Sequence, residues 1–236
     1  MIGLGTIINA FGILIGSVLG CLFGKVLNKR FQDILNCSCG VCVLFLGITG
    51  TVQKSIILTS DGTFAVRGSL MAIASMCIGA LVGEMLNIEK HTEDFGEWLK
   101  VKSKSEGDTC FVDGFVTSSL TVCVGAMAVI GPINDAIYGD LSTLIAKSVL
   151  DTVIIFTLSS TYGKGCAFSA LPIIVVEGLM TLLAKLVQPI LTTAALDNLS
   201  LVGSMLIFCV GVNLTFGKRI RVANLLPAML VAILAG

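Results

Sequence analysis

Charged residues are scarce in this chain, and their scarcity argues against an ordinary soluble fold. Only 13% of the 236 residues are Asp, Glu, Lys or Arg, whereas 55% are hydrophobic. Soluble domains carry about 25% charged residues. Fifteen basic and fifteen acidic side chains leave a formal net charge of zero. We therefore expect no nucleic-acid partner and no acidic substrate.

Histidine is nearly absent as well, which argues against a metal centre. His91 is the one histidine, and Cys37 and Cys39 form C-x-C rather than C-x-x-C. A zinc site or a disulfide framework is therefore not expected, and the nine cysteines are interpreted as small apolar residues. The H-E-x-x-H, G-x-S-x-G and P-loop motifs are missing too. We expect no enzymatic activity, no cofactor and no primary pumping by this chain alone.

The chain instead contains a series of long apolar runs. A spanning helix needs roughly 20 apolar residues, and windows of that length predict an all-α, polytopic transmembrane bundle forming a single integral membrane domain over 1–236. The first run lacks a basic segment and an A-x-A-like site, so it is expected to be a span rather than a cleaved signal peptide. The eight predicted spans are 3–24, 36–52, 67–87, 111–130, 141–160, 168–187, 199–216 and 222–236, the second and last being short.

Residues 88–108 form the one long polar stretch of the sequence. Ile88, Phe95, Trp98 and Leu99 interrupt its charges, which predicts an amphipathic helix on the membrane surface with Trp98 at headgroup depth. A simple solvated connector is the alternative.

Basic residues are distributed unevenly among the predicted loops. Eleven of the fifteen follow the first, third, fifth and seventh spans, three lie towards the other side of the membrane (Lys54, Arg67 and Lys185), and Lys147 lies in the interior of a span. The positive-inside rule then places 88–108 in the cytoplasm and both termini outside.

An internal similarity links spans two and three to spans seven and eight. The stretch DILNCSCGVCVLFLGIT (33–49) resembles DNLSLVGSMLIFCVGVN (197–213) at one constant offset, which aligns Gly47 with Gly211. The spans that follow carry small residues at four-residue spacing: Ser75, Gly79 and Gly83 in one copy, Ala228, Ala232 and Gly236 in the other. Because five spans separate the copies, they are predicted to form an inverted repeat, as in many secondary transporters. Chance similarity between apolar sequences is the alternative.

The first span carries four glycines at strict four-residue spacing. Gly12, Gly16, Gly20 and Gly24 leave one helix face almost free of side chains. Such a face favours close helix packing, with a glycine-lined conduit as the alternative.

Three charged residues fall well inside the fifth and sixth predicted spans. Lys147 and Asp151 lie one helical turn apart in the fifth span, and Glu177 lies in the middle of the sixth without a local basic partner. Intramembrane charges are costly and usually face a cavity, a partner or an ion path. We predict that Asp151 and Lys147 contact each other and face Glu177 across a polar cavity. A purely structural ion pair is the alternative.

Polar residues of the fourth span extend this predicted site. Its substrate- or ion-binding residues are Asp151, Glu177, Lys147, Asp113, Thr117, Ser118, Thr121 and Asn213. Hydroxyl groups often bond to carbonyls of their own helix, so the alternative is that Thr and Ser are accommodated in the span without any binding role. Asn9 and Asn224 add further amides in or beside other spans.

The acidic connector 131–140 is predicted to be a turn. Gly131-Pro132 should end the fourth helix and Asp140 should cap the fifth. An acidic vestibule formed by Asp135 and Asp140 is the alternative.

Several separated motifs together resemble one known family. GTIINAFGILIGSVLG, GFVTSSLTVCVGAMAVIGPINDAIYGD, KSVLDT and RVANLLPAML occur in this order across essentially the full chain. They resemble the bacterial inner-membrane family called domain of unknown function 554, which includes YqgA-like and YdfK-like proteins. The resemblance implies a multi-pass protein of the bacterial inner membrane and supplies no activity.

The residues themselves favour a secondary transporter or channel-like permease for a small solute or cation, with a midplane acidic site. The alternative is a non-transporting membrane scaffold or partner subunit whose glycine ladders serve assembly. The expected partners are the lipid bilayer and the solute or cation. Homo-oligomer formation is left open.

Overall fold

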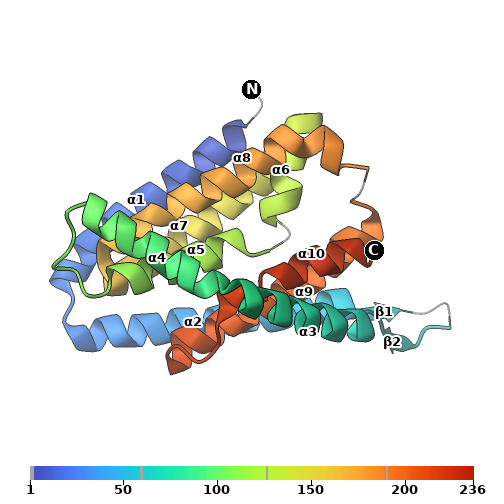
Figure 1. Cartoon of the computed structure of the whole chain (residues 1–236), viewed down its shortest axis with the longest axis horizontal. Coiled ribbons are helices and arrows are strands. Elements are labelled where there is room, and N and C mark those ends of the chain that lie inside the picture. Colours follow the sequence, from blue (N-terminus) through green and yellow to red (C-terminus); the bar gives the residue numbers. More distant parts are fainter. Residues whose placement is uncertain (1–2, 59–60, 126, 190) are drawn as a thin grey trace. The chain divides into compact units, whose positions relative to one another are not determined.

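The computed structural model describes residues 3–58, 61–125, 127–189 and 191–236, and most of them are helical. This confirms the predicted all-α class. Within these ranges one antiparallel hairpin pairs β1 (Ile56–Leu58) with β2 (Phe64–Val66). The helices, labelled in Figure 1, are α1 (Leu4–Val26), α2 (Lys29–Ser55), α3 (Ser69–Leu86), α4 (Ile88–Lys102), α5 (Phe111–Cys123), α6 (Met127–Tyr138), α7 (Ser142–Tyr162), η1 (Gly163–Ser169), α8 (Ala170–Val187), α9 (Thr193–Phe216), η2 (Val222–Leu225) and α10 (Pro227–Leu234).

The chain divides into two compact units, each assembled from segments far apart in the sequence. Unit 1 consists of Met1–Cys39, Lys90–Cys123 and Met127–Gln188, and unit 2 consists of Gly40–Glu89, Val124–Ala126 and Pro189–Gly236. The first turns of α2 belong to unit 1 and the rest of that helix to unit 2.

The glycine ladder of α1 packs directly on α7 in unit 1. A Cβ at Gly16 would stand 2.5 Å from the carbonyl oxygen of Thr152, and Gly12, Gly20 and Gly24 face α7 equally closely. Contacting residue numbers rise together on the two helices, so α1 and α7 run parallel. Small-residue ladders allow this backbone-to-backbone approach, which leaves no room for a conduit along the contact.

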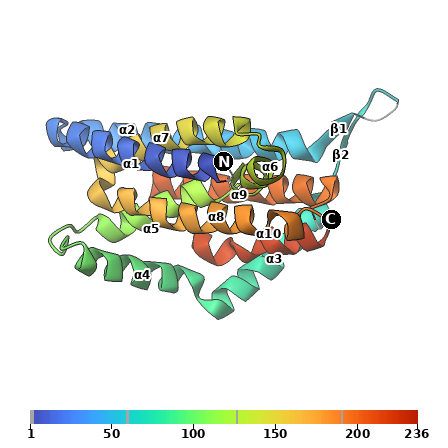
Figure 2. The ribbon, with the colours of Figure 1, turned by 90° about the horizontal axis from the view of Figure 1, so that it is seen from above.

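α7 and α8 are joined by η1 and run in opposite directions. Both helices pack against α1, beside which Figure 2 shows them. The amide of Asn9 on α1 bonds to Asp151 on α7 and to Glu177 on α8, which places the middles of the two helices together. This geometry makes α1, α7 and α8 the frame for the intramembrane charges.

α5 and α6 form a bent pair rather than one straight helix. α5 ends at Cys123, α6 begins at Met127, and their axes are inclined by 56°. The predicted fourth span, 111–130, crosses this bend and includes residue 126, which lies outside the described residues. The expectation that Gly131-Pro132 ends a helix is wrong, because α6 continues through Pro132 to Tyr138. Proline removes one intrahelical hydrogen bond, and burial of both residues offsets that loss.

In unit 2, α2 and α9 cross at the glycines that the predicted repeat aligns. Gly47 lies against the backbone of Phe208, and Gly211 lies against the backbone of Leu44. Gly47 and Gly211 are 164 positions apart, and so are Leu44 and Phe208, so each contact is the counterpart of the other. Rising numbers on α2 meet falling numbers on α9. The two helices are therefore antiparallel, as an inverted repeat requires.

The small-residue ladders of unit 2 also pack on each other. Gly79 on α3 lies against Ala228 on α10, and Gly83 lies against the backbone of Asn224. Ser75 and Ala232 are both buried, with 1% and 0% of their surface exposed. α3 and α10 are thus antiparallel as well. Their small-residue ladders form a helix–helix contact within the chain.

Among the described residues, five helical stretches are long and apolar enough to span a membrane, or six if the bent α5–α6 pair counts as one span. One of the five, Ser142–Val187, covers the predicted span 168–187 and all but the first residue of the predicted span 141–160 in a single 46-residue stretch. The predicted last span holds only η2 and the eight-residue α10. The membrane bundle is confirmed, and the count of eight stays a prediction.

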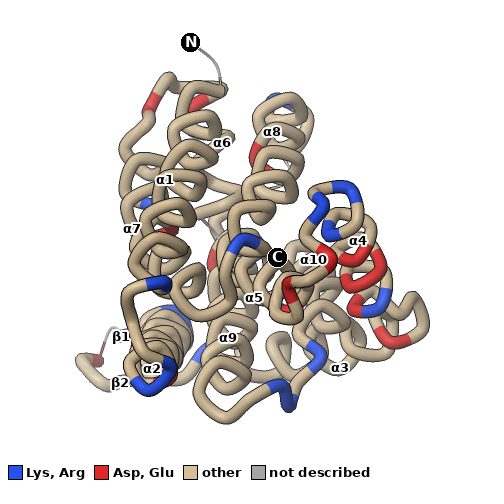
Figure 3. The backbone as a smooth tube through the Cα atoms, turned by 90° about the vertical axis from the view of Figure 1, so that its left-hand side faces the viewer, with Lys and Arg blue, Asp and Glu red and all other residues tan. Residues whose placement is uncertain are grey.

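The polar stretch after α3 forms α4, an amphipathic helix as predicted. Leu99 is buried, and the Phe95 ring lies 5.8 Å from that of Phe115 on α5. Charged residues of both signs mark this helix in Figure 3. Trp98 is exposed and stacks on Phe95. Its location at a membrane surface stays a prediction.

Candidate functional site: a buried charge cluster

The predicted contact between Lys147 and Asp151 is present in the middle of unit 1. Lys147 Nζ lies 2.6 Å from Asp151 Oδ2, one helical turn away on α7. The two side chains are only 7% and 6% exposed. Residues at i and i+4 share a helix face, which is why the spacing alone could predict this pair.

Lys147 also bonds to the backbone of a second helix. Its Nζ donates to the carbonyl oxygen of Val122 at 2.7 Å. Val122 belongs to the last turn of α5, whose carbonyls have no partner within their own helix. An ammonium group at a helix C-terminus is favoured by the helix dipole. Lys147 therefore closes the end of α5 while it pairs with Asp151.

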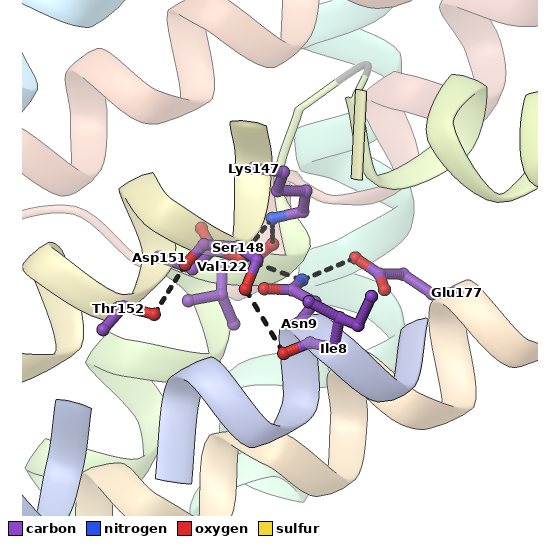
Figure 4. Close-up of polar contacts among 8 residues, drawn as sticks. All are labelled: Ile8, Asn9, Val122, Lys147, Ser148, Asp151, Thr152 and Glu177. Carbon is purple, nitrogen blue, oxygen red and sulfur yellow. Dashed lines mark hydrogen bonds and ion pairs between the residues drawn. The ribbon is translucent and has the colours of Figure 1, made fainter. Parts of the chain in front are cut away.

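Asn9 connects the ion pair to Glu177. Its Nδ2 donates to Asp151 Oδ2 at 3.1 Å and to Glu177 Oε1 at 2.8 Å (Figure 4). Both Asn9 and Glu177 are fully buried, at 0% exposure. An amide, rather than the predicted open cavity, thus separates the two carboxylates. We name Asn9, Lys147, Asp151 and Glu177 the Asn9 cluster.

The Asn9 cluster leaves several buried oxygen atoms without hydrogen bonds. Within the described residues, Asn9 Oδ1 and Glu177 Oε2 are buried without a hydrogen bond of normal geometry, and so is the hydroxyl of the neighbouring Thr6, which interacts with Glu177. Buried polar groups are normally hydrogen-bonded, so each exception calls for an explanation. With both acids ionised, the cluster would hold two negative charges and one positive charge. Its excess charge requires a proton or another cation.

Other residues of the predicted site have local partners. Ser118 and Thr121 donate to carbonyl oxygens of their own helix α5, at 2.6 and 2.7 Å. Asp113 is exposed in the first turn of α5, where an acid is favoured by the dipole. Thr117 is half-buried on the same helix, and its carbonyl accepts the Thr121 hydroxyl. None of these contacts joins α5 side chains to the Asn9 cluster.

Asn213 belongs to unit 2, where it organises a turn. Its Nδ2 donates to the carbonyl oxygen of Ile220, and its Oδ1 accepts the backbone N–H groups of Arg219 and Ile220. The predicted ligand is therefore engaged in closing the loop after α9. Sequence alone does not distinguish this role from ligand binding.

The two acids of the connector 131–140 serve helix ends. Asp135 Oδ2 accepts the backbone N–H groups of Gly3 and Gly5, both at 3.1 Å, at the start of α1. Asp140 accepts the backbone N–H of Ser142 at the start of α7, but the N-cap residue of this helix is Leu141, one position later than the predicted cap. That hydrogen bond lowers the pKa of the Asp140 carboxyl.

Unit 2 holds a second cluster of acids around Asn224. Glu89 is buried and pairs with Lys218 at 3.1 Å, and its Oε2 accepts the backbone N–H of Ala223. Asn224 Oδ1 accepts the backbone N–H of Glu89, and its Nδ2 donates to Glu84. The members of this Asn224 cluster are Glu84, Glu89, Lys218, Arg221 and Asn224, with Arg221 paired to Glu84. In the sequence, Asn224 stands out as a polar residue beside a predicted span, and Lys218 and Arg221 as basic residues after the seventh span.

The comparisons with known proteins agree with the resemblance seen in the sequence. A family described as "Protein of unknown function (DUF554)" matches residues 4–235. The chain belongs to the DUF554 family. This DUF554 chain is 30% identical over 227 residues to "Uncharacterized membrane protein YdfK" of Bacillus subtilis strain 168, covering 96% of the chain and 93% of YdfK. It is 26% identical over 233 residues to "Uncharacterized protein YqgA" of Escherichia coli strain K12, covering 97% and 94%.

No solved structure matches the DUF554 chain. The family match, the membrane-protein relative and the apolar helices together identify a multi-pass membrane protein.

Proposed function

We propose that this DUF554 protein is a secondary transporter or channel-like permease for a small cation or solute, acting in the bacterial inner membrane. The Asn9 cluster would be its ion site. In this proposal the chain is not an enzyme, and its partners are the bilayer and the transported species.

The observation that carries the proposal is the uncompensated carboxylate of Glu177. The side chain is fully buried and accepts one hydrogen bond, from Asn9; the Thr6 hydroxyl lies near it, and no salt bridge to Glu177 is present within the described residues. Insertion scales assign an intramembrane Asp or Lys about 2.5–3.5 kcal/mol at the helix centre. A buried ion pair adds little net stability over apolar packing. Stability alone therefore does not account for a second acid beside a paired one, whereas a proton or cation site does.

Two further features support transport. Transporters often place their ion sites at broken helices and build them from inverted repeats. Here α5 and α6 are bent by 56° next to the cluster, and unit 2 contains antiparallel contacts that obey a repeat offset. The scaffold alternative needs free glycine ladders for assembly. Those of α1 and α3 are occupied by α7 and α10 within the chain.

The direct test is ion-driven flux through purified protein in liposomes. Vesicles loaded with a pH-sensitive dye are exposed to gradients of Na⁺, K⁺ and protons, one at a time. The wild-type chain should move protons or the cation, and Glu177→Gln should abolish that flux while the protein still folds. Glu97→Gln is the matched control, because Glu97 is 59% exposed on α4. Absence of flux under every gradient, or full flux in Glu177→Gln, would contradict the proposal.

The orientation is tested separately by labelling. A single cysteine at position 103, in a background without native cysteines, should react with an impermeant reagent only from the cytoplasmic side, because the positive-inside rule places the loop after the third predicted span there. Reaction only from outside would reverse the proposed orientation, including the outer location of both termini.

A further inference from the structure

A small polar pocket in unit 2 lies where α2 ends and where α3 and α9 begin. Its polar lining residues are Gln53, Lys54, Arg67, Asp197 and Asn198. We name it the Arg67 pocket. Each of the three helices is long and apolar enough to span a membrane. The pocket therefore lies at the ends of three candidate spans, which is the depth of the lipid headgroups.

The size of the Arg67 pocket limits what it can hold. Its volume is about 150 Å³, whereas pockets for whole small molecules measure about 300–1,000 Å³. One charged group fits into such a space, and a complete metabolite does not.

The charges of the Arg67 pocket favour an anion. Lys54 Nζ pairs with Asp197 Oδ1 at 2.7 Å, and the two side chains are about one-third exposed. Arg67 is exposed, and its guanidinium has no hydrogen bond or ion pair to a described residue. Two cations and one acid leave one positive charge. The planar fork of arginine donors matches the oxygen atoms of a phosphate group.

The first turns of α2 carry a second site of the same charge composition in unit 1. An open groove of about 830 Å³ is lined there by Lys29, Arg30 and Asp33. We name it the Arg30 groove. Lys29 and Arg30 are exposed, and neither side chain has an ion pair to a residue that the structure describes. Two cations and one acid again leave one positive charge.

The internal repeat relates the two sites to each other. Its offset of 164 positions aligns residues of the Arg67 pocket with residues of the Arg30 groove, namely Asp197 with Asp33, Asn198 with Ile34 and Leu201 with Cys37. Equivalent positions of the two copies thus line both sites. This agreement is independent of the charge count.

The length of α2 matches the spacing of the two headgroup layers of a bilayer. The helix has 27 residues, which at 1.5 Å per residue gives about 40 Å. A bilayer with its headgroup regions is about 40–45 Å thick. With α2 as a span, Lys29 and Lys54 at its two ends lie in opposite headgroup layers. The phosphate of a phospholipid is the anion that is present at both depths.

We propose that the Arg67 pocket and the Arg30 groove each bind the phosphate group of an anionic phospholipid, one in each leaflet. Basic pockets between membrane helices are known to hold anionic headgroups. The single negative charge of phosphatidylglycerol neutralises each site, whereas phosphatidylethanolamine brings its own ammonium group and leaves the positive charge in place. Ile57 and Leu201 line the first site and Phe31 and Ile34 the second. These apolar side chains suit the glycerol and acyl carbons of a lipid, which free phosphate lacks.

The experiment counts lipids bound to purified full-length protein by native mass spectrometry. The protein in detergent is titrated with equimolar phosphatidylglycerol and phosphatidylethanolamine. Wild type should retain two phosphatidylglycerol molecules per chain in preference to phosphatidylethanolamine. Arg67→Gln and Arg30→Gln should each weaken one of the two binding events about fivefold, and the double variant should weaken both.

Arg219→Gln is the matched control. It removes the same charge from an exposed position in the loop after α9, and Arg219 lines neither site. This variant should bind both lipids as wild type does. If Arg67→Gln does not fold, Lys54→Gln tests the same pocket, because a partly exposed ion pair contributes little to stability. A parallel titration replaces the lipids by sodium phosphate at constant ionic strength and should show no binding at the same concentrations.

Three results would overturn the proposal. They are equal retention of phosphatidylethanolamine, unchanged phosphatidylglycerol binding in the double variant, and an equal loss of binding in Arg219→Gln. Binding of inorganic phosphate that the same two arginine variants abolish, without binding of phosphatidylglycerol, would assign the sites to free phosphate and overturn the lipid. The assay involves no transport, so its outcome is separate from that of the flux test.

Discussion

The Asn9 cluster and the Asn224 cluster contain similar residues but differ in how their charges are balanced. Each has two acids, an asparagine and a lysine, and the Asn224 cluster adds Arg221. Asn224 uses both its oxygen and its nitrogen, whereas Asn9 uses only its nitrogen and leaves its oxygen buried without a partner among the described atoms. Two cations balance two acids in unit 2, while one cation faces two acids in unit 1.

Exposure separates the clusters further. The Lys218 and Arg221 side chains are 50% and 64% exposed, so water can replace a lost partner. Lys147 and Asp151 are 7% and 6% exposed, so water cannot replace a partner that either of them loses. The comparison teaches that a cluster with equal numbers of acids and cations, open to solvent, stabilises helix ends. A buried cluster with one acid in excess needs a proton or another cation to neutralise it. Three substitutions to the corresponding amide test this difference.

Asp151→Asn should have the largest effect on stability. It leaves the Lys147 ammonium buried without its carboxylate, and breaking a buried ion pair costs about 3–5 kcal/mol. Thermal unfolding in detergent should show a large fall in melting temperature. The control is the double variant Lys147→Leu/Asp151→Leu, which should recover most of the stability and lose ion flux. A double variant as unstable as the single one would contradict this explanation.

Glu89→Gln should have an intermediate effect. Glu89 is buried, but its partner Lys218 is half-exposed and can turn towards water. The amide oxygen of glutamine can still accept the Ala223 N–H that now bonds to Glu89 Oε2. We expect a loss of about 1–3 kcal/mol, as for a hydrogen bond to a charged group, measured by the same unfolding assay. Ion flux should not change. A loss equal to that of Asp151→Asn would remove the contrast between the clusters.

Glu84→Gln should have the smallest effect. Glu84 is 55% exposed and pairs with the exposed Arg221, and exposed pairs contribute about 0.2–1 kcal/mol. Added salt should shrink the difference from wild type further. Urea or thermal unfolding at low and high salt checks both statements. A salt-independent loss would show that the Asn224 bond, rather than the ion pair, carries the contribution of Glu84.

Local sequence spacing predicted the features that lie on one helix or repeat along the chain. Composition indicated an all-α membrane protein, the i,i+4 spacing indicated the Lys147–Asp151 contact, and glycine spacing indicated the packing face of α1. The constant offset between Gly47 and Gly211 indicated two copies, the five predicted spans between them indicated opposite orientations, and the antiparallel contact of α2 and α9 agrees with both. Each of these depends on periodicity, which sequence displays directly.

Contacts between distant segments could not be predicted in the same way. Asn9 and Glu177 are 168 positions apart, and an asparagine in an apolar helix has many alternative partners. The role of Asn213 depends on where the following loop turns. Continuation of α6 through Pro132 depends on burial, which outweighs a local stop signal. Tertiary packing decides these three cases, and a single sequence does not show which distant segments pack together.

In unit 2, the sequence separation between aligned residues of the two repeat copies differs between the first and the second helix of each copy. Gly47 and Gly211 are 164 positions apart, but Ser75 and Ala228 are 153 apart, so one copy holds eleven surplus residues between its helices. The segment from the start of β1 at Ile56 to the end of β2 at Val66 also counts eleven residues. The length of the hairpin segment thus equals the whole difference between the two sequence offsets.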